Sequence, residues 1–433
     1  MIKQLIYFIA GAPLVLQAQT PLSVQDAIRT AWSQQSGLQA GAAMVARSRA
    51  EAAAMSDLRL PTATLGVGVI RTDEPMLAFG TRLDQARITQ ADFAPSSLNR
   101  PDAIVGTGAT LTLSQPLYAG GRLDAARRAG AAMAEAEGAS QEHRKQQVAL
   151  AITQAYFGAQ VAEEALRYAE DTLKQAMETD RFVQARVEQG LMLKADGERT
   201  KAFCAQSGAG VAEAKARVAS ARSALAMLAG ADIAADKLIT PLGLPVVEAA
   251  TTAGQRGDLQ AMREQVRAAE EGVLAAKGSL KPEVGLQFTA GTMRDSLNSG
   301  GNWTTVSLGA KWTFSFGDSQ RVSAARAAAR AAELTVKWQE SVANREVEEA
   351  RRAIQTAQAK IGFAKTALAA SESVRAIRTA RYREGLLPLM DVLDAESSLT
   401  GARTLLISSQ LDFRLGQAQL ALALGQPIEN VKE

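Results

Sequence analysis

The chain has few of the side chains that catalytic and metal sites use most. Its 433 residues include one cysteine, Cys204, and one histidine, His143. A disulfide within the chain is therefore impossible, and a metal cluster or catalytic triad built from several such residues is nearly excluded. No phosphate-binding glycine motif is present either. The sequence predicts a protein that is not an enzyme and that needs no cofactor and no metal.

Charge of one sign and long apolar runs are also scarce. The formal net charge is +3, which gives no reason to expect a nucleic acid as a partner. Residues 5–16 are mostly apolar and follow Lys3, a pattern typical of a secretory signal peptide with cleavage after Ala18. The alternative is a short buried helix. Beyond this region no run approaches the length of a transmembrane helix, so the exported chain would be soluble, surface-attached or a β-barrel.

Proline is absent from residues 117–240 and 283–387. These spans are rich in alanine, glutamate, arginine and glutamine, which favour helices. We predict helices over 121–189 and 319–384, each roughly 100 Å long, with return helices over 191–229 and 386–424 of roughly 60 Å. Shorter helices are predicted over 22–36, 38–58 and 258–280. Helices of roughly 100 Å do not fit inside a globular domain.

The same plan occurs twice in the chain. Gly190 and Gly385 each interrupt a long helical pattern, and Gly230 and Gly425 each end an apolar helix. Both pairs are separated by 195 residues (385 − 190 and 425 − 230). An internal duplication predicts two copies of one structural unit. The unit here is a pair of strands followed by a long helical hairpin, which is more typical of a conduit than of a catalyst.

Four stretches alternate apolar and polar residues with the period of a strand: 63–69, 108–114, 284–290 and 305–316. A soluble sheet is the common interpretation, but a tilted membrane strand has the same length. In the fourth stretch Trp312, Phe314 and Phe316 would form an aromatic girdle at the lipid interface. Each pair of strands is predicted to be a hairpin, and residues 71–102 in the first are predicted to form a large polar loop.

The last helix carries a seven-residue repeat. Large residues occupy one position of the repeat and small residues the position three further on, an arrangement that predicts knobs-into-holes packing and a left-handed supercoil. The large residues are Val392, Leu399, Leu406, Phe413 and Leu420, and the small ones are Ala395, Ala402, Ser409, Gly416 and Ala423. Subtracting 195 places Cys204 at the position of Leu399, so we interpret it as a small core residue.

Four strands cannot close a barrel by themselves. An open sheet in lipid would leave the polar groups of its edges unpaired, so closure requires several chains. Small residues along the long helices also indicate close packing of many helices. The sequence therefore predicts a homo-oligomeric channel in an outer membrane, with a long helical extension into the periplasm.

From about residue 21 to 428 the chain resembles the TolC family of outer-membrane efflux and secretion channels. The resemblance rests on residues 113–122 (LSQPLYAGGR), on Gly190 and Gly385, and on residues 391–396 (DVLDAE). It implies a mainly α fold with a four-stranded β contribution. It also implies a homotrimer whose twelve-stranded transmembrane β-barrel continues into a periplasmic α-helical barrel of coiled-coil hairpins.

The segments expected from this layout follow the duplication. They are 1–18 (signal peptide), 19–60 (N-terminal helices), 61–118 (first β-hairpin with a long extracellular loop), 119–230 (first long helical hairpin), 231–257 (equatorial connector), 258–281 (helix of the second repeat), 282–318 (second β-hairpin), 319–425 (second long helical hairpin) and 426–433 (C-terminal tail).

The resemblance also implies site residues. Asp391 and Asp394 match the family's aspartates that line the closed periplasmic aperture, where a trimer would stack two acidic rings that favour cations. The alternative is that they stabilise the start of a helix. Tyr382 and Asp196 match the family's latch, a phenol–carboxylate hydrogen bond. Leu387 departs from the pattern because it cannot supply the basic residue that joins the latch in some members.

The hairpin tips around Gly190, Leu191, Gly385 and Leu386 would dock a periplasmic adaptor. The alternative is that the leucines only fasten the turn. For the latch itself two alternatives follow from Leu387: the latch is weaker than in those members, or another cation, such as Arg383 or Lys194, takes the place of the basic residue.

The functional interpretation is the exit duct of a tripartite efflux system, closed at rest and opened on adaptor docking. Its partners would be two further copies of the chain, the adaptor, an RND-type or ABC-type inner-membrane pump and outer-membrane lipid. The alternatives are the outer-membrane component of type I protein secretion and a soluble periplasmic coiled-coil adaptor. Sequence does not reveal the cargo.

Overall fold

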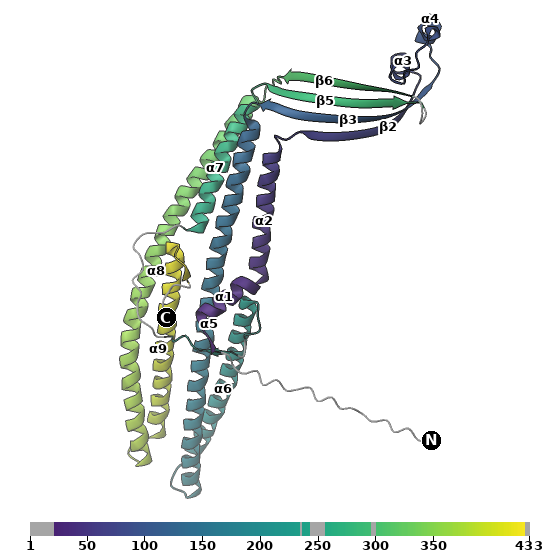
Figure 1. The fold of residues 1–433 in the computed structure, drawn as a ribbon. Coiled ribbons are helices and arrows are strands. Elements are labelled where there is room, and N and C mark those ends of the chain that lie inside the picture. The colour runs from purple at the N-terminus through teal and green to yellow at the C-terminus, as the bar shows by residue number, and fades with distance from the viewer. Residues whose placement is uncertain (1–20, 234–235, 243–255, 296–299, 429–433) are drawn as a thin grey trace, which may run out of the picture. The chain divides into compact units, whose positions relative to one another are not determined.

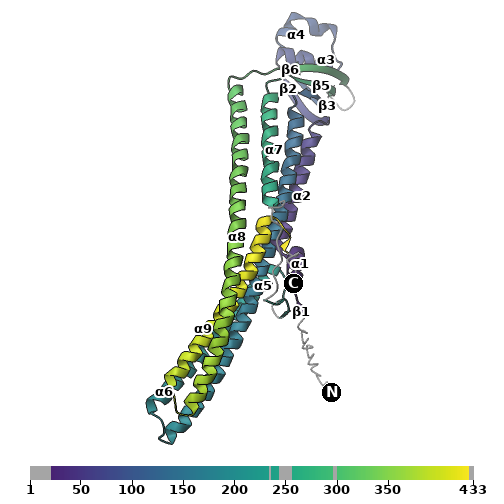
Figure 2. The ribbon, with the colours of Figure 1, turned by 90° about the vertical axis from the view of Figure 1, so that its left-hand side faces the viewer.

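The computed structural model describes residues 21–233, 236–242, 256–295 and 300–428. The predicted signal peptide and most of the predicted equatorial connector lie outside these residues. The chain divides into two units. One comprises residues 1–42, 141–257 and 341–433, and the other comprises residues 43–140 and 258–340. Residues of two long helices, α5 (Arg122–Glu188) and α8 (Asp318–Arg383), belong to both units. Figures 1 and 2 show these helices from two sides.

The second unit contains the sheet. Its strands are β2 (Thr62–Thr72), β3 (Ile104–Ala119), β5 (Glu283–Arg294) and β6 (Gly300–Lys311). They pair antiparallel in the order β2-β3-β5-β6, so the two predicted hairpins lie side by side (Figure 1). The predicted mainly α fold with four strands is confirmed. The outer edges of β2 and β6 have no strand partner among the described residues.

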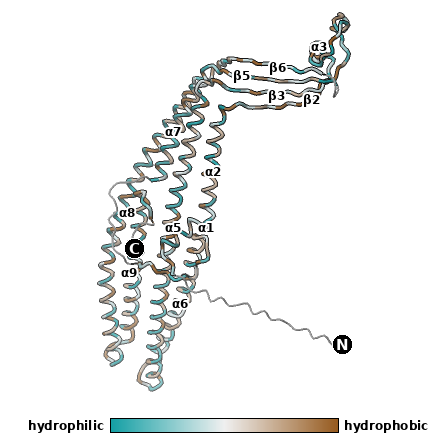
Figure 3. Tube along the Cα trace, in the orientation of Figure 1, coloured by the Kyte–Doolittle hydropathy of each residue, from teal (hydrophilic) through white to brown (hydrophobic). Residues whose placement is uncertain are grey.

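The sheet has one apolar and one polar face, because successive side chains of a strand point to opposite sides. Leu65, Val67 and Val69 of β2 and Val306 and Leu308 of β6 lie on the apolar face and are 69–74% exposed. The opposite face carries mainly threonine, serine and glycine. Figure 3 shows apolar residues (brown) interleaved with polar ones along the strands. A single chain therefore leaves its apolar sheet face uncovered.

The end of the fourth strand differs from the prediction. The strand ends at Lys311, before the aromatic residues Trp312, Phe314 and Phe316. These side chains are 57%, 77% and 108% exposed, and the rings of Trp312 and Phe314 stack at 4.8 Å. Lys311 pairs with Glu283, the first residue of β5, so the ladder ends there, and Trp312 Nε1 donates to the carbonyl of Leu280 at 3.0 Å.

The prediction of a polar loop over residues 71–102 is wrong. The segment folds into α3 (Pro75–Asp84), a 3₁₀ turn, η1 (Gln90–Phe93), and α4 (Pro95–Asn99). Prolines that were interpreted as loop markers occupy the first position of α3 and of α4, where the missing N–H has no helical partner to lose. We call residues 73–103 the insert.

The junction between β3 and α5 is tightly packed. Gly120 has a φ of +66°, and a Cβ at this position would overlap the carbonyl oxygen of Gly278 at the end of α7 (Gly257–Gly278). Arg128 forms a bidentate ion pair with Glu271 of α7, with N–O distances of 2.7 and 2.8 Å. These contacts fix α7 beside the first turns of α5, where the strands enter the helices.

The first unit is built around α1 (Val24–Gln34), α5, α6 (Lys194–Ala229), α8 and α9 (Leu389–Leu424). Its core contains Ile28, Ile152, Tyr156 and Leu225, all nearly inaccessible to solvent. The hydroxyl of Tyr156 donates to the carbonyl of Leu22 at 2.7 Å and accepts from the amide of Thr240 at 2.9 Å. It thereby holds the short parallel pair β1 (Pro21–Leu22) and β4 (Lys237–Leu238). The helix α2 (Ser36–Asp57) leads from this unit toward β2.

The duplication is visible in the backbone. Gly190, Gly385, Gly230 and Gly425 all have positive φ, between +69° and +79°. The predicted heptad of α9 is also confirmed by burial. Its small positions are all buried, and of its large positions only Leu406 is half-buried. A Cβ on Gly416 would approach Ile354 of α8 to 2.9 Å, so the small residue is required for close approach.

Within the residues that the structure describes, none of the helices combines the length and the apolar character needed to cross a bilayer.

Candidate functional site

Both hairpins turn in the same way at their tips. The amide of Leu191 donates to the carbonyl of Arg186 at 2.8 Å, and that of Leu386 donates to Arg381 at 2.9 Å. Each bond spans a glycine in the left-handed region, which is the hydrogen-bond pattern of a Schellman cap. A residue with a Cβ would be strained there, and for this reason the sequence marked both tips.

A buried cluster joins the two tips. Val183 of α5 packs with Tyr382 of α8 and with Leu389 and Val392 of α9, and each of these side chains is at most 4% exposed. The ring of Phe182 meets that of Tyr382 edge-on at a centroid distance of 5.9 Å. Tyr382 is thus one of the side chains that anchor the second hairpin on the first near the tips.

The hydroxyl of Tyr382 has a different partner from the predicted one. In the part of the chain that the structure describes, it donates to Met192 Sδ at 3.7 Å, a weak bond, and not to Asp196. Burial raises the pKa of the hydroxyl, the nearby Asp196 carboxylate raises it further, and Arg186 lowers it. Asp196 therefore lies close enough to affect the pKa of Tyr382, and a latch between them stays a prediction.

A cation does lie near the Tyr382 ring, although Leu387 cannot supply it. Arg186 of α5 lies over the ring of Phe182 at 4.7 Å and donates to the carbonyl of Arg383 at 3.5 Å. The sequence had offered Arg383 or Lys194 for this role. The signal for Arg186 was its position four residues before Gly190, on the helix face that meets the second hairpin.

The two aperture candidates differ in their surroundings. Asp391 is half-buried in the first turn of α9, whereas the side chain of Asp394 is 68% exposed. Arg378 of α8 donates to Asp394 Oδ2 at 2.8 Å and to the backbone carbonyl of Asp391 at 3.1 Å. One arginine therefore contacts both positions.

Sequence analysis also missed a group of charges between the hairpins, which we call the charge cluster: Asp171, Arg375, Glu396 and Arg403. Arg403 Nη1 of α9 lies 2.8 Å from Asp171 Oδ2 of α5, with the guanidinium over the ring of Tyr168 at 4.8 Å. Arg375 of α8 pairs with Glu396 at 3.4 Å. Glu396 and Arg403 are largely buried, whereas Arg375 and Asp171 keep more contact with solvent.

Burial raises the pKa of Glu396 in this cluster. Arg375 opposes the rise, Asp171 adds to it, and Arg403 opposes it. Glu396, the last residue of the segment 391–396 on which the resemblance rests, is thus a buried carboxyl that pairs α9 with α8. Its partners could not be found from sequence because they come from other helices.

The apolar residues of the tips divide into two groups. Met192 packs into the Tyr382 cluster, so it fastens the turn. Leu191, Leu193 and Leu386 are 66%, 72% and 67% exposed and lie outside that cluster. Large apolar side chains are thus exposed at both tips, and exposed apolar surface of this kind can mark a docking surface.

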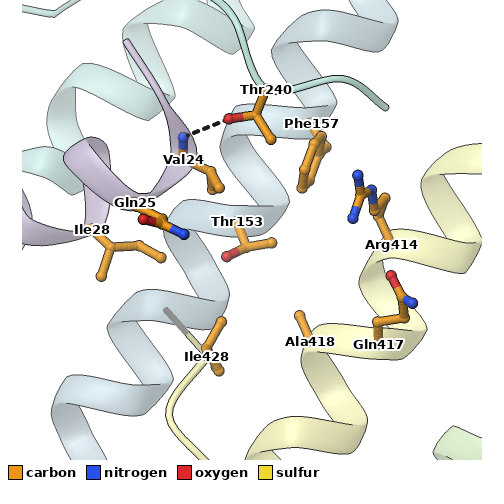
Figure 4. A pocket seen from close by; sticks show the side chains of 10 residues that line it. All are labelled: Val24, Gln25, Ile28, Thr153, Phe157, Thr240, Arg414, Gln417, Ala418 and Ile428. Atoms are coloured by element: carbon orange, nitrogen blue, oxygen red, sulfur yellow. Dashed lines mark hydrogen bonds between the residues drawn. The ribbon is translucent and has the colours of Figure 1, made fainter. Parts of the chain in front are cut away.

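A cavity of about 30 Å³ lies between α1, α5 and α9, with Thr153, Arg414 and Gln417 among its lining residues (Figure 4). It has room for little more than ordered water. No group of three or more His, Cys, Asp or Glu residues that could hold a metal ion occurs in the described part of the chain.

Comparison with known proteins gives one family. The family model described as outer membrane efflux protein matches residues 27–231 and 251–426. The cation efflux system protein CusC of Escherichia coli (strain K12) is 24% identical over 288 residues, which cover 63% of this chain and 63% of that protein. The match therefore spans less than two thirds of the length of this curated relative. CusC of Escherichia coli O157:H7 is 23% identical over the same length.

Solved structures share the fold over nearly the whole chain. The outer membrane protein VceC of Vibrio cholerae has a TM-score of 0.80 and 21% identity, with 94% of this chain and 96% of that chain covered. The CmeC outer membrane channel of Campylobacter jejuni has a TM-score of 0.82 and 18% identity, with coverages of 98% and 93%. These similarities establish a TolC-like fold.

Proposed function

The chain belongs to the outer membrane efflux protein family, and on that premise we propose that it is the exit duct of a tripartite efflux system. Three copies would form one tunnel that crosses the outer membrane and extends into the periplasm. Small-molecule cargo would pass from an inner-membrane pump through this tunnel. The relatives are efflux channels and not enzymes, which agrees with the lack of catalytic residues.

One observation carries the proposal: the sheet is incomplete in a single chain. Among the described residues the outer edges of β2 and β6 are unpaired, and the apolar face is 69–74% exposed at Leu65, Val67, Val69, Val306 and Leu308. Lipid would cover that face, but it cannot satisfy the backbone groups of open edges. Pairing β6 of one copy with β2 of the next satisfies both, and three copies would give a closed barrel of twelve strands with its polar face inside.

The hairpin tips would form the closed periplasmic aperture. Asp391 and Asp394 would supply two acidic rings, and Arg378 would offset part of their charge. The acidic rings favour cations over anions, and the curated relatives that match are named cation efflux proteins. Tyr382, with Asp196 beside it, would hold the aperture shut mainly through its buried ring, and Arg186 would provide the cation that Leu387 lacks.

The exposed tip residues would bind the adaptor. Leu191 and Leu386, next to Gly190 and Gly385, occupy equivalent positions of the two repeats and are equally exposed. Docking there would pull on the turns that end at the Tyr382 cluster, so the adaptor would act where the two hairpins are joined. An RND-type or ABC-type pump would complete the system.

The proposal is tested by reconstitution of the purified chain in planar bilayers. We expect trimers by native mass spectrometry, ion conductance, and a reversal potential that shows cation preference. Asp391→Asn with Asp394→Asn should reduce that preference. Asp412→Asn is the matched control, because Asp412 also lies on α9 but faces Lys360 at 4.0 Å near the surface. A monomer that does not conduct would overturn the proposal.

A further inference from the structure

The insert between β2 and β3 is a folded body and not a flexible loop. Its helix α3 and the residue that follows it bury Ala78, Thr81 and Gln85, which are 0%, 5% and 1% exposed. The rings of Phe79 and Phe93 pack edge-on at 5.7 Å. Two ion pairs, Arg82 with Asp92 and Arg87 with Asp295, close it on itself and onto the end of β5.

The insert lies on the polar face of the sheet. A Cβ on Gly106 of β3 would come within 2.9 Å of Thr81 Cγ2, and one on Gly301 of β6 would overlap the carbonyl oxygen of Asp84. Gln85 Nε2 donates to the carbonyl of Val105 at 2.8 Å. Gly106 alternates with the apolar residues of β3, so it lies on the same face of the strand as Gly108, Thr110 and Thr112. This is the polar face, and its glycines leave the space that α3 occupies.

The buried and exposed faces of α3 show which side it turns away from the sheet. Ala78, Thr81 and Gln85 form the stripe that faces the strands. At about 100° per residue, Met76, Gly80 and Leu83 lie on the opposite side of the helix. Met76 is 79% exposed and Leu83 is 51% exposed, and a Cβ on Gly80 would have no neighbour within 4 Å.

From these contacts we infer that the insert forms a second barrier of the channel, at the outer end of the barrel. The inference rests on the proposed closed barrel, in which the polar face of the sheet lines the lumen. The insert follows the end of β2 and precedes the start of β3, so it stands at the strand ends opposite to the α5 junction (Figure 1).

The width of the proposed barrel leaves little open space between three inserts. Twelve strands about 4.8 Å apart and tilted by about 40° enclose a barrel with a backbone radius of about 12 Å. A helix with its side chains is about 10–12 Å thick. Three copies of α3 on the inner face would therefore meet near the axis, and the stripe formed by Met76, Gly80 and Leu83 of each copy would contact those of the other two. Cargo leaves only when the three inserts separate.

Cross-linking tests this geometry. The variant Gly80→Cys is made in a chain that also carries Cys204→Ser, so that the new cysteine is the single thiol. Position 80 is suitable because its φ is ordinary and a side chain added there meets no neighbouring atom. A bismaleimide about one helix diameter long (~10 Å) should join copies in the assembled protein. Val67→Cys in the same background is the matched control, since the side chain of Val67 is 74% exposed on the apolar face and should point into lipid without cross-linking.

Each result decides between the two proposals. Trimers by native mass spectrometry in which Gly80→Cys is cross-linked and Val67→Cys is not support the second barrier. Trimers in which Gly80→Cys stays unlinked overturn the barrier and leave the proposed duct intact. If the protein is monomeric and neither variant is cross-linked, the proposed duct fails and the barrier with it.

Discussion

Replacing Arg403 with methionine should loosen the attachment of α9 to α5. Arg403 connects the helices through Asp171 at 2.8 Å and through its guanidinium over Tyr168 at 4.8 Å. Methionine keeps the apolar stem of the side chain and removes the charge. The two hairpins then stay joined by the Tyr382 cluster near the tips and by the core around Ile152 and Tyr156, which includes Ala418 and Ala421 of α9.

The cost follows from the burial of the partners. An exposed ion pair contributes at most about 1 kcal/mol, whereas breaking a buried one costs about 3–5 kcal/mol. Arg403 is 16% exposed and Asp171 is 38% exposed, so solvent screening places this pair near the lower figure. With ~0.5–1 kcal/mol for the cation–π contact, the total is about 2 kcal/mol, equivalent to roughly 30-fold in an opening equilibrium.

Amide hydrogen exchange with mass spectrometry measures that equilibrium. Peptides from residues 389–410 of the assembled protein should exchange roughly 30-fold faster in Arg403→Met. Asp171→Asn should produce most of the same change, and the double variant little more than either single one. Lys360→Met is the control, because its pair with Asp412 also joins helices but is 4.0 Å long and more than half exposed. Equal exchange in Arg403→Met and Lys360→Met would refute the reasoning.

Three further predictions concern the same joints. Burial raises the pKa of Glu396, so the folded protein favours the protonated carboxyl. The contribution of this carboxyl to folding stability is therefore complete below the ordinary carboxyl pKa and is lost as pH rises through the raised pKa. Glu396→Gln should therefore raise the thermal stability at neutral pH and flatten its dependence on pH, and an unchanged pH profile would contradict this. Gly120→Ala should abolish trimer formation in detergent, since a Cβ there meets backbone, whereas Gly121→Ala should cost only ~1–2 kcal/mol for its positive φ. Tyr382→Phe should leave the conductance nearly unchanged, because the hydroxyl makes only a weak bond to sulfur. Tyr382→Ala should remove about 3–5 kcal/mol of packing energy and increase the conductance. Equal conductance in the two variants would refute this reasoning.

Much of the fold could be predicted from local pattern. Proline-free spans rich in alanine and glutamate locate α5 and α8 to within one residue at each end, because helix propensity accumulates over long segments. Alternation locates the four strands, and the glycines at 190 and 385 locate the tips because a left-handed residue is needed to end a helix in that way. The insert was interpreted wrongly because Pro75 and Pro95 signal a helix start as well as a loop.

The candidate site was predicted in part. Asp391, Asp394 and Tyr382 were predicted through the family resemblance, the structure places all three near the tip of the second hairpin, and their roles stay predictions. Arg186, Arg378 and the charge cluster were not found, because their partners lie on other helices and no spacing along the chain connects them. The partner of the Tyr382 hydroxyl, the sulfur of Met192 in the first hairpin tip, could not be predicted for the same reason.

The sequence by itself determined what repeats along one dimension: the length of the helices, the alternation of the strands, the heptad of α9 and the duplication at 195 residues. The alternation and the heptad depend on periods that backbone geometry fixes, helix length follows from propensity summed along the chain, and the duplication is a repeat in the sequence itself. The tertiary structure decided which side chains meet across helices and which face of the sheet the insert covers. Those contacts depend on the rotation of one element about another, and short-range pattern contains no information about that angle.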